Sequence, residues 1–443
     1  MDNTDALKNK LINGSVEKHF FRYVSQNIMG VVGLTAYYFA DTYFISQAAG
    51  ADGLTALNLI LPFFYFIYAV GDMFGIGAAT RFTVERARGN ATAELCFGNA
   101  LTYMAIFGAI LAVIGWFWAE QLLAFCGADK SIVALGGNYL RIVLVFSGGF
   151  LLALIVLPFV RNDGSPRLAM IATLVSSLYN IVFDYILIFP MGLGMVGAAL
   201  ATVTAPIVGG IVAIIHLRSP HNTLRVKPNL SLTRAFDAVK LGTSAFVGEI
   251  SSCVVMVLYN SLFLLYTGNE GVAAYGVIAN LATMVAAVFS GLLQGAQPLM
   301  SFYHGCRIFI KRQRVLRLSL ITSLVLATLI MVFLDVFRHY IIAIFNRDGD
   351  RLLAEYASLG ILCYFPGFLF AGINVIGAGF LSATEVAGWA GLISILRGFV
   401  MIFVTALTLP KFLGITGIWL SFPVAELLTM LVVIYALKDS GAK

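Results

Sequence analysis

Five acidic side chains lie within apolar runs long enough to cross a lipid bilayer: Asp41, Asp72, Asp184, Glu249 and Glu426. An ionised carboxylate at the bilayer centre costs about 2.5 to 3.5 kcal/mol on the gentler insertion scales. Acids inside membrane segments therefore mark ion or substrate paths by default. The alternative for each is a structural role, as an acid that hydrogen-bonds within the helix bundle or pairs with Arg141 or Arg397 near the end of a run.

Asp41 and Asp184 stand out because of their neighbours. Tyr37 precedes Asp41 by four residues, and Asn180 precedes Asp184 by four. On a helix, each acid would share a face with a hydrogen-bonding group one turn away. Two carboxylates, an amide and a hydroxyl supply the hard oxygen ligands that a small cation prefers. The same carboxyl groups could instead hold protons, because burial and a like-charged neighbour both favour the neutral form.

The elements that would position these residues are membrane helices. The chain of 443 residues is 60% hydrophobic and 11% charged, with a mean hydropathy of +0.92, which lies outside the range of soluble domains. A spanning helix needs about 20 apolar residues. The sequence predicts an all-α membrane protein with twelve spans, at residues 20–46, 54–81, 95–119, 132–160, 168–189, 196–217, 240–266, 272–300, 318–337, 353–380, 389–409 and 415–437.

The chain also repeats itself. Pro190, Gly194 and Gly197 recur 220 positions later as Pro410, Gly414 and Gly417, and residues 41–81 match residues 260–300 at a shift of 219. A polar linker at residues 219–231 divides the chain, so we expect an N-terminal six-helix lobe at 1–225 and a C-terminal one at 226–443. Because each lobe has an even number of spans, a pseudo-two-fold axis along the membrane normal should relate them.

The two lobes do not carry the same charges. In this alignment Asp41 faces Asn260 and Asp184 faces Val404. The candidate cation site therefore falls in the N-terminal lobe alone.

Lys and Arg residues indicate the orientation, because cytoplasmic loops are enriched in them. Most of the 28 fall on the side of the N-terminus, whereas the other side holds Lys130, Arg141, Arg338, Arg347, Arg351 and Lys411. We expect a multi-pass protein of the cell membrane with both termini in the cytoplasm and no cleaved leader. The net charge of +6 is then a topology signal, and we expect no nucleic-acid partner.

Other motifs have ordinary explanations. The five Cys residues are scattered and are expected to be packing residues. Gly192, Gly194 and Gly197 spell G-x-G-x-x-G, but the motif joins two spans and is expected to be a tight turn. The sequence has no H-E-x-x-H or G-x-S-x-G motif, so we expect neither an enzyme nor a bound cofactor.

Several stretches in both lobes resemble the multidrug and toxic compound extrusion (MATE) family, in particular its prokaryotic DinF-like branch. They are Y-Y-F-A-D-T-Y-F-I at 37–45, Y-N-I-V-F-D-Y-I-L-I-F at 179–189, G-M-V-G-A-A-L-A-T at 194–202, Q-G-A-Q-P-L at 294–299, and G-I-T-G-I-W-L-S-F-P-V-A-E at 414–426. The resemblance implies a coupling-ion site, for H⁺ or Na⁺, at Asp41, Asn180, Asp184 and Thr202. Tyr37 and Tyr139 would belong to its hydrogen-bond network.

The resemblance implies an antiporter that works by alternating access, and we expect it to be a monomer. It would export amphipathic, often cationic, drugs in exchange for H⁺ or Na⁺, with membrane lipids as its other partners. Further residues that could line the drug cavity are Asp72, Glu249, Asn260, Gln294 and Gln297. The alternatives are a flippase for lipid-linked saccharides and a channel. Acids rather than cations within the spans favour a cationic cargo over a pyrophosphate-linked one.

Two departures from the family pattern concern proline. Where the family often has proline on the first and seventh spans, this chain has Val24–Ser25–Gln26 and Gly242–Thr243–Ser244. A mechanism that bends the first helix at proline is therefore not expected here.

Overall fold

The computed structural model describes residues 8–9, 11–219, 222–346 and 350–441, and these contain helices and no strands. In the first half the helices are α2 (Val16–Ala87), η1 (Ala91–Ala93), α3 (Glu94–Phe125), α4 (Lys130–Val145), α5 (Ser147–Asn162), α6 (Pro166–Ile188), α7 (Gly194–Ile214) and η2 (Ile215–Arg218). In the second half they are α8 (Leu232–Gly305), α9 (Phe309–Val336), α10 (Arg338–Phe345), α11 (Arg351–Tyr364), α12 (Gly367–Ala383), α13 (Ala387–Ile395), η3 (Leu396–Val400), α14 (Met401–Thr408) and α15 (Pro410–Asp439). Arg347 lies outside the described residues.

The helices account for the twelve predicted spans. Among the described residues, nine helical segments are long and apolar enough to cross a membrane. Two further spans are helix pairs, α4 with α5 and α11 with α12, which bend by 47° and 48° at their junctions. Helix α8 has 74 residues and breaks at Gly268, so it supplies two spans rather than one. The all-α, twelve-span prediction is confirmed.

Glycines break the backbone at equivalent places in the two halves. Gly50 interrupts α2 with φ 59°, and Gly268 interrupts α8 with φ 71°. Gly194 and Gly414, which the repeat pairs, also have positive φ, at 52° and 57°. Residues with a Cβ rarely adopt this conformation. The sequence repeat therefore reflects a repeated backbone geometry.

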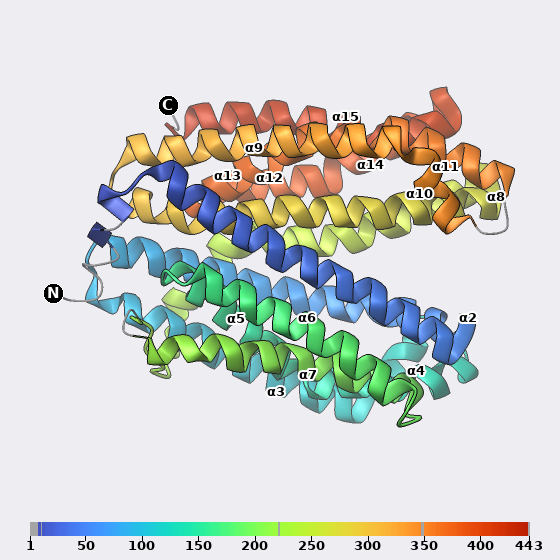
Figure 1. Cartoon of the computed structure of the whole chain (residues 1–443), viewed down its shortest axis with the longest axis horizontal. Helices are drawn as coiled ribbons and strands as arrows, with labels where there is room; N and C mark the ends of the chain where they lie inside the picture. Colours follow the sequence, from blue (N-terminus) through green and yellow to red (C-terminus); the bar gives the residue numbers. More distant parts are fainter. Residues whose placement is uncertain (1–7, 10, 220–221, 347–349, 442–443) are drawn as a thin grey trace.

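The two halves lie side by side (Figure 1), with the blue-to-green helices on one side and the yellow-to-red helices on the other. One buried core runs from Ile45 to Ala238 and another from Tyr259 to Ala425. A third core packs the start of α2 against α8, α9 and α12 and so joins the halves. The lobe boundary at residue 225 stays a prediction.

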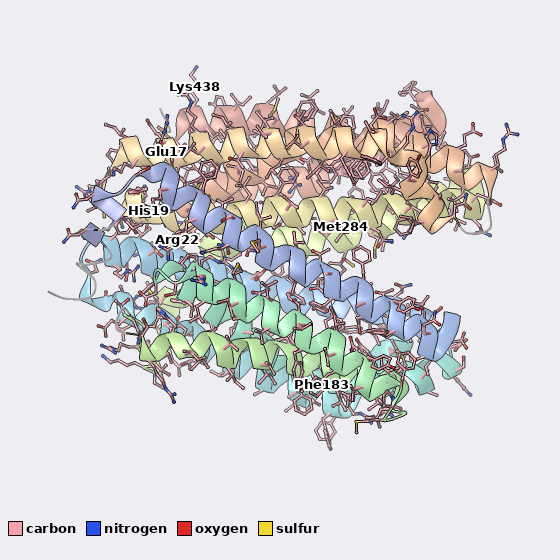
Figure 2. All side chains as sticks on the ribbon, viewed as in Figure 1. Glu17, His19, Arg22, Phe183, Met284 and Lys438 are labelled. Carbon is pink, nitrogen blue, oxygen red and sulfur yellow. The ribbon has the colours of Figure 1, made fainter. Side chains whose placement is uncertain are left out.

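Both chain ends lie at the same end of the bundle, which we call the terminal side (Figure 1). The labelled side chains of Glu17, His19, Arg22 and Lys438 also lie toward this side (Figure 2). On the outer surface, Trp116, Phe117 and Trp118 of α3 are 64%, 63% and 51% exposed. Large aromatic side chains on an outward face suit lipid better than water.

Candidate functional site

Three helices bring the predicted site residues together. Asp41 lies on α2, Asn180 and Asp184 lie on α6, and Thr202 lies on α7. These helices approach closely because small residues face their neighbours: a Cβ on Gly33 would come within 2.4 Å of Leu174, and one on Gly197 within 2.8 Å of the Leu187 backbone. Tyr139 of α4 completes the group, and its ring lies 6.4 Å from that of Phe64.

The site is buried, yet most of its polar atoms have no hydrogen-bond partner among the described residues. Asp41 is 7% exposed, and Asn180, Asp184 and Tyr139 are at 0%. The unpartnered atoms are Asp41 Oδ1, both carboxylate oxygens of Asp184, both amide atoms of Asn180, the Tyr139 hydroxyl and Thr202 Oγ1. The two carboxyl groups are close enough to interact, and their charges also reach the Tyr139 hydroxyl. Buried polar groups nearly always have partners, so this cluster is suited to receive a proton or a small cation.

Another buried acid of the same half shows the usual arrangement. Asp163 is at 0% exposure, but its oxygens accept hydrogen bonds from Thr223 N at 2.8 Å and Thr223 Oγ1 at 2.5 Å, and one lies 2.8 Å from His216 Nε2. It also forms an ion pair with Arg86. Burial alone therefore does not leave an acid unpaired in this fold.

Tyr37 lies one helical turn from Asp41 and is 7% exposed. Its ring centroid is 4.4 Å from that of Tyr38, and its hydroxyl interacts with those of Tyr38 and Tyr68. The structure thus connects Tyr37 to a tyrosine cluster that extends from the predicted site toward the second half of the chain.

Among the described residues of the C-terminal half, the equivalent positions carry no matching set of unpaired oxygens. Asn260 is half-buried and Val404 is 53% exposed. Nearby, the Tyr259 hydroxyl bonds Ser421 Oγ at 2.6 Å, and aromatic rings stack around it, with Tyr259 and Tyr275 5.3 Å apart.

The buried acid of that half, Glu426, is fully paired. Its Oε1 accepts from Arg397 Nε at 2.6 Å, and its Oε2 accepts from Asn374 Nδ2 at 2.7 Å. The sequence suggests that a membrane acid could pair with Arg397, but it does not predict the hydrogen bond from Asn374 to Glu426. These three residues lie far apart in the sequence, so no local pattern could identify the group.

Two of the predicted cavity residues form hydrogen bonds between the halves. Gln297 Nε2 donates to Thr80 Oγ1 at 2.7 Å, and Arg161 Nη2 donates to Gln294 Oε1 at 3.0 Å. Both pairs lie toward the terminal side, where α2 and α8 cross. Here a Cβ added to Gly77 would lie 1.9 Å from the carbonyl oxygen of Ala238, and a Cβ added to Gly242 would lie 1.9 Å from the carbonyl oxygen of Met73.

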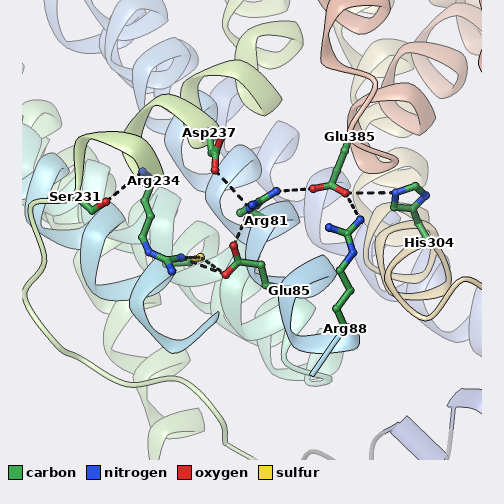
Figure 3. A network of polar contacts seen from close by, with 9 residues as sticks. Arg81, Glu85, Arg88, Ser231, Arg234, Asp237, His304 and Glu385 are labelled. Atoms are coloured by element: carbon green, nitrogen blue, oxygen red, sulfur yellow. Dashed lines mark hydrogen bonds and ion pairs between the residues drawn. The ribbon is translucent and has the colours of Figure 1, made fainter. Parts of the chain in front are cut away.

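An ion-pair network closes the terminal side of this interface (Figure 3). Arg81 of α2 contacts Glu385, which lies between α12 and α13, at 2.6 Å, and Arg88 pairs with the same carboxylate. Arg234 at the start of α8 contacts Glu85 of α2 at 3.2 Å. We call this network, together with the crossing at Gly77 and Gly242, the terminal-side gate. In the sequence, the basic residues of this network indicate only the orientation of the chain in the membrane.

No group of three or more His, Cys, Asp and Glu side chains placed to hold a metal ion occurs in the described parts of the chain. The oxygen set around Asp41 and Asp184 differs from such a group because an amide and hydroxyls complete it.

Curated relatives match nearly the whole chain. The Multidrug export protein MepA of Staphylococcus aureus (strain MSSA476) is 27% identical over 421 residues, which cover 93% of this chain and 92% of that protein. MepA of Staphylococcus saprophyticus is 27% identical over 434 residues, with 96% and 95% coverage.

Solved structures match the fold. A multidrug resistance MATE family transporter of the MOP superfamily in an outward-facing conformation superposes with a TM-score of 0.89 at 19% identity, over 98% of both chains. A MOP superfamily transporter from Pyrococcus furiosus gives a TM-score of 0.90 at 19% identity, again over 98% of both chains. The family model MatE matches residues 28–186 and 245–408, once in each half. The chain is a member of the MATE family of multidrug efflux transporters.

Proposed function

We propose that this protein is an antiporter that exports amphipathic, cationic compounds in exchange for H⁺ or Na⁺ by alternating access. The coupling site is formed by Asp41, Asn180, Asp184 and Thr202, with Tyr139 beside them and Tyr37 one turn away. The name of its Staphylococcus relatives, multidrug export protein, supports the direction and the class of cargo.

One observation carries this proposal: the cluster of buried, unpartnered polar atoms around Asp41 and Asp184. Two interacting carboxyl groups cannot both stay ionised and bare at low cost. A proton or a small cation relieves that cost, and hard oxygen ligands suit Na⁺. Protonation or cation binding at this site would therefore change the charge of a buried region between α2 and α6.

The Lys and Arg distribution supports a cytoplasmic location for the terminal side. With the terminal-side gate closed, we propose that the arrangement is an outward-facing state. Coupling then requires that the ion and the cargo each favour one state over the other, since a ligand shifts an equilibrium only by its differential affinity.

Transport in proteoliposomes with separately imposed Na⁺ and H⁺ gradients tests the proposal. As the coupling ion flows down its gradient, an organic cation such as ethidium should move in the opposite direction and accumulate on the side from which the ion enters. Asp41→Asn and Asp184→Asn should each abolish this gradient-driven transport. The matched control is Glu120→Gln on α3, which removes an exposed acid that pairs with Arg141 at 2.7 Å. Gradient-driven transport that persists in both site variants would rule out this coupling site.

A further inference from the structure

A groove lies on the terminal side, between the start of α2 and the start of α9, which are neighbours in Figure 1. Its volume is about 330 Å³. Three of its lining side chains are cations, one is an amide and two are apolar: Lys311, Arg314, Arg317, Gln313, Val16 and Ile310. None of these residues belongs to the coupling site or to the terminal-side gate. The groove therefore needs an explanation of its own.

Two of the cations fix the walls of this groove. Lys311 Nζ donates hydrogen bonds to the carbonyl oxygens of Ile12, at 2.6 Å, and Gly14, at 3.2 Å. Arg314 Nε contacts Glu17 Oε1 at 2.8 Å. These contacts attach the first turn of α2, and the residues just before it, to α9. The groove is thus preformed, and a ligand would not have to order it.

The groove carries more positive than negative charge. Lys311 bonds carbonyl oxygens, which have no net charge to offset its own. Arg317 is exposed, and its side chain forms no hydrogen bond or ion pair with any residue that the structure describes. Within the described part of the chain, Glu17 is the one acid that pairs with a cation of the groove. The three cations and this acid leave an excess of two positive charges, which attracts an anion.

The groove continues onto the outward face of α9. Ile310, Arg314, Arg317, Ile321 and Leu324 follow one another at spacings of four and three residues, so they share one face of the helix. Ile321 and Leu324 are 49% and 39% exposed. From residue 318 to residue 334 the sequence has no charged side chain. This stretch is about 25 Å long at 1.5 Å per residue, close to the thickness of the hydrocarbon layer. Arg317 therefore lies at the level of the lipid headgroups.

The chemistry of this face indicates an amphipathic anion. Guanidinium groups match phosphate oxygens in a bidentate manner, and an ammonium group adds a point charge. The apolar stripe that follows Arg317 suits a hydrocarbon chain. A zwitterionic headgroup would bring its own cation toward a groove that already has excess positive charge. Soluble phosphate would gain the charge interaction but not the apolar contact.

We propose that this groove is a binding site for an anionic phospholipid. The phosphate lies among Lys311, Arg314 and Arg317, and an acyl chain lies along the exposed face of α9. The site differs from general contact with the bilayer because it selects the headgroup by charge. Since Val16 belongs to α2 and the cations to α9, the headgroup lies across the two halves of the chain. The inference is independent of the coupling ion and of the cargo.

Native mass spectrometry of the full-length protein, delipidated in a neutral detergent, tests the selectivity. Phosphatidylglycerol should bind at least tenfold more tightly than phosphatidylcholine with the same acyl chains. Arg317→Gln breaks no contact with a described residue, and it should weaken phosphatidylglycerol binding at least fivefold and leave phosphatidylcholine binding unchanged. The matched control is Arg225→Gln, which removes an exposed cation from the linker on the terminal side and should change neither affinity. Equal affinities for the two lipids in the parent protein, or an unchanged preference in Arg317→Gln, would overturn the site.

A second measurement locates the lipid and distinguishes it from free phosphate. In a variant whose only cysteine replaces Gln313, maleimide labelling should be at least fivefold slower in phosphatidylglycerol nanodiscs than in phosphatidylcholine nanodiscs. Each rate is divided by that of a single cysteine at Val226, which is 60% exposed, because an anionic surface also changes the thiolate fraction. Inorganic phosphate added to phosphatidylcholine nanodiscs should not slow the labelling. Equal protection by inorganic phosphate would assign the groove to a soluble anion, and no protection by phosphatidylglycerol would show that the lipid does not occupy it. Either result would contradict the proposal.

Discussion

Buried acids in this protein occur in two conditions, paired and unpaired. Asp163 and Glu426 are each held by several donors, including an arginine. Asp41 and Asp184 have only each other and neighbouring polar atoms that lack partners. An acid whose hydrogen-bond donors are all supplied by the protein has a structural role. An unpaired acid can bind or release a proton or a cation without breaking hydrogen bonds within the fold.

This difference predicts opposite effects of the same substitution. Asp163→Asn removes one partner of a buried ion pair and leaves Arg86 uncompensated, which we expect to cost about 3 to 5 kcal/mol. Asp41→Asn removes a carboxylate whose burial is unfavourable, so it should cost no stability. Thermal unfolding of the detergent-purified variants, followed by tryptophan fluorescence, measures both. A loss of stability in Asp41→Asn comparable to that in Asp163→Asn would mean that Asp41 is a structural residue.

The two kinds of acid look alike in the sequence. The free-energy cost of a carboxylate in lipid identifies Asp41, Asp184 and Glu426 as residues that need an explanation, and the four-residue spacing of Asn180 and Asp184 correctly places them on one helix face. The pairing of Glu426 with Asn374 and Arg397 depends on how α12, η3 and α15 pack together. No local pattern encodes that packing, so the sequence left the role of Glu426 open.

At the level of helices, the crossing of α2 and α8 is set by backbone contact rather than by side chains. Because a Cβ on Gly77 would lie 1.9 Å from a carbonyl oxygen, alanine cannot fit there without separating the helices. Gly77→Ala should therefore open the terminal-side gate. We expect a cysteine introduced at buried Thr80 to label at least fivefold faster in this background. Gly148→Ala is the control, since nothing lies within 4 Å of its Cβ position, and equal labelling in the two backgrounds would show that the crossing is not what closes this side.

The ion pairs of the terminal-side gate predict that its closure does not change between pH 5 and pH 8. Hydrogen bonds from His304 and Arg88, with the nearby charges of Arg88 and Arg81, lower the pKa of Glu385 from 4.5 to about 2. A carboxylate with a lowered pKa contributes fully above its unfolded value and loses its contribution as pH falls toward 2. A thiol reacts as its thiolate, so each labelling rate is divided by that of free cysteine at the same pH. The normalised rate at position 80 should thus stay constant between pH 5 and pH 8, and Glu385→Gln should raise it equally at both. A steep rise of the normalised rate in the parent protein between these values would contradict the role of Glu385.

The whole molecule combines a repeated scaffold with unequal chemistry. The repeat, the twelve spans and the turn at Gly194 could all be predicted, because hydrophobic length and turn chemistry are local properties of the sequence. The breaks at Gly50 and Gly268 and the terminal-side gate were not predicted. The gate depends on how two lobes meet, and Arg81 and Glu385 are separated by 304 residues.

The inequality predicts that one lobe alone senses the coupling ion. The oxygen ligands lie on α2, α6 and α7, whereas the equivalent region of the second half contains stacked aromatic rings and the paired Glu426. Saturation with the coupling ion should therefore change the labelling rate of a single cysteine at position 253, relative to free cysteine under the same conditions, in the parent protein and in Glu249→Gln, but not in Asp184→Asn. Because this readout needs no cargo, it separates ion sensing from cargo binding. If Glu249→Gln lost the ion response as completely as Asp184→Asn, the acid on α8 would be a second coupling residue, and the two sites would have to act as one.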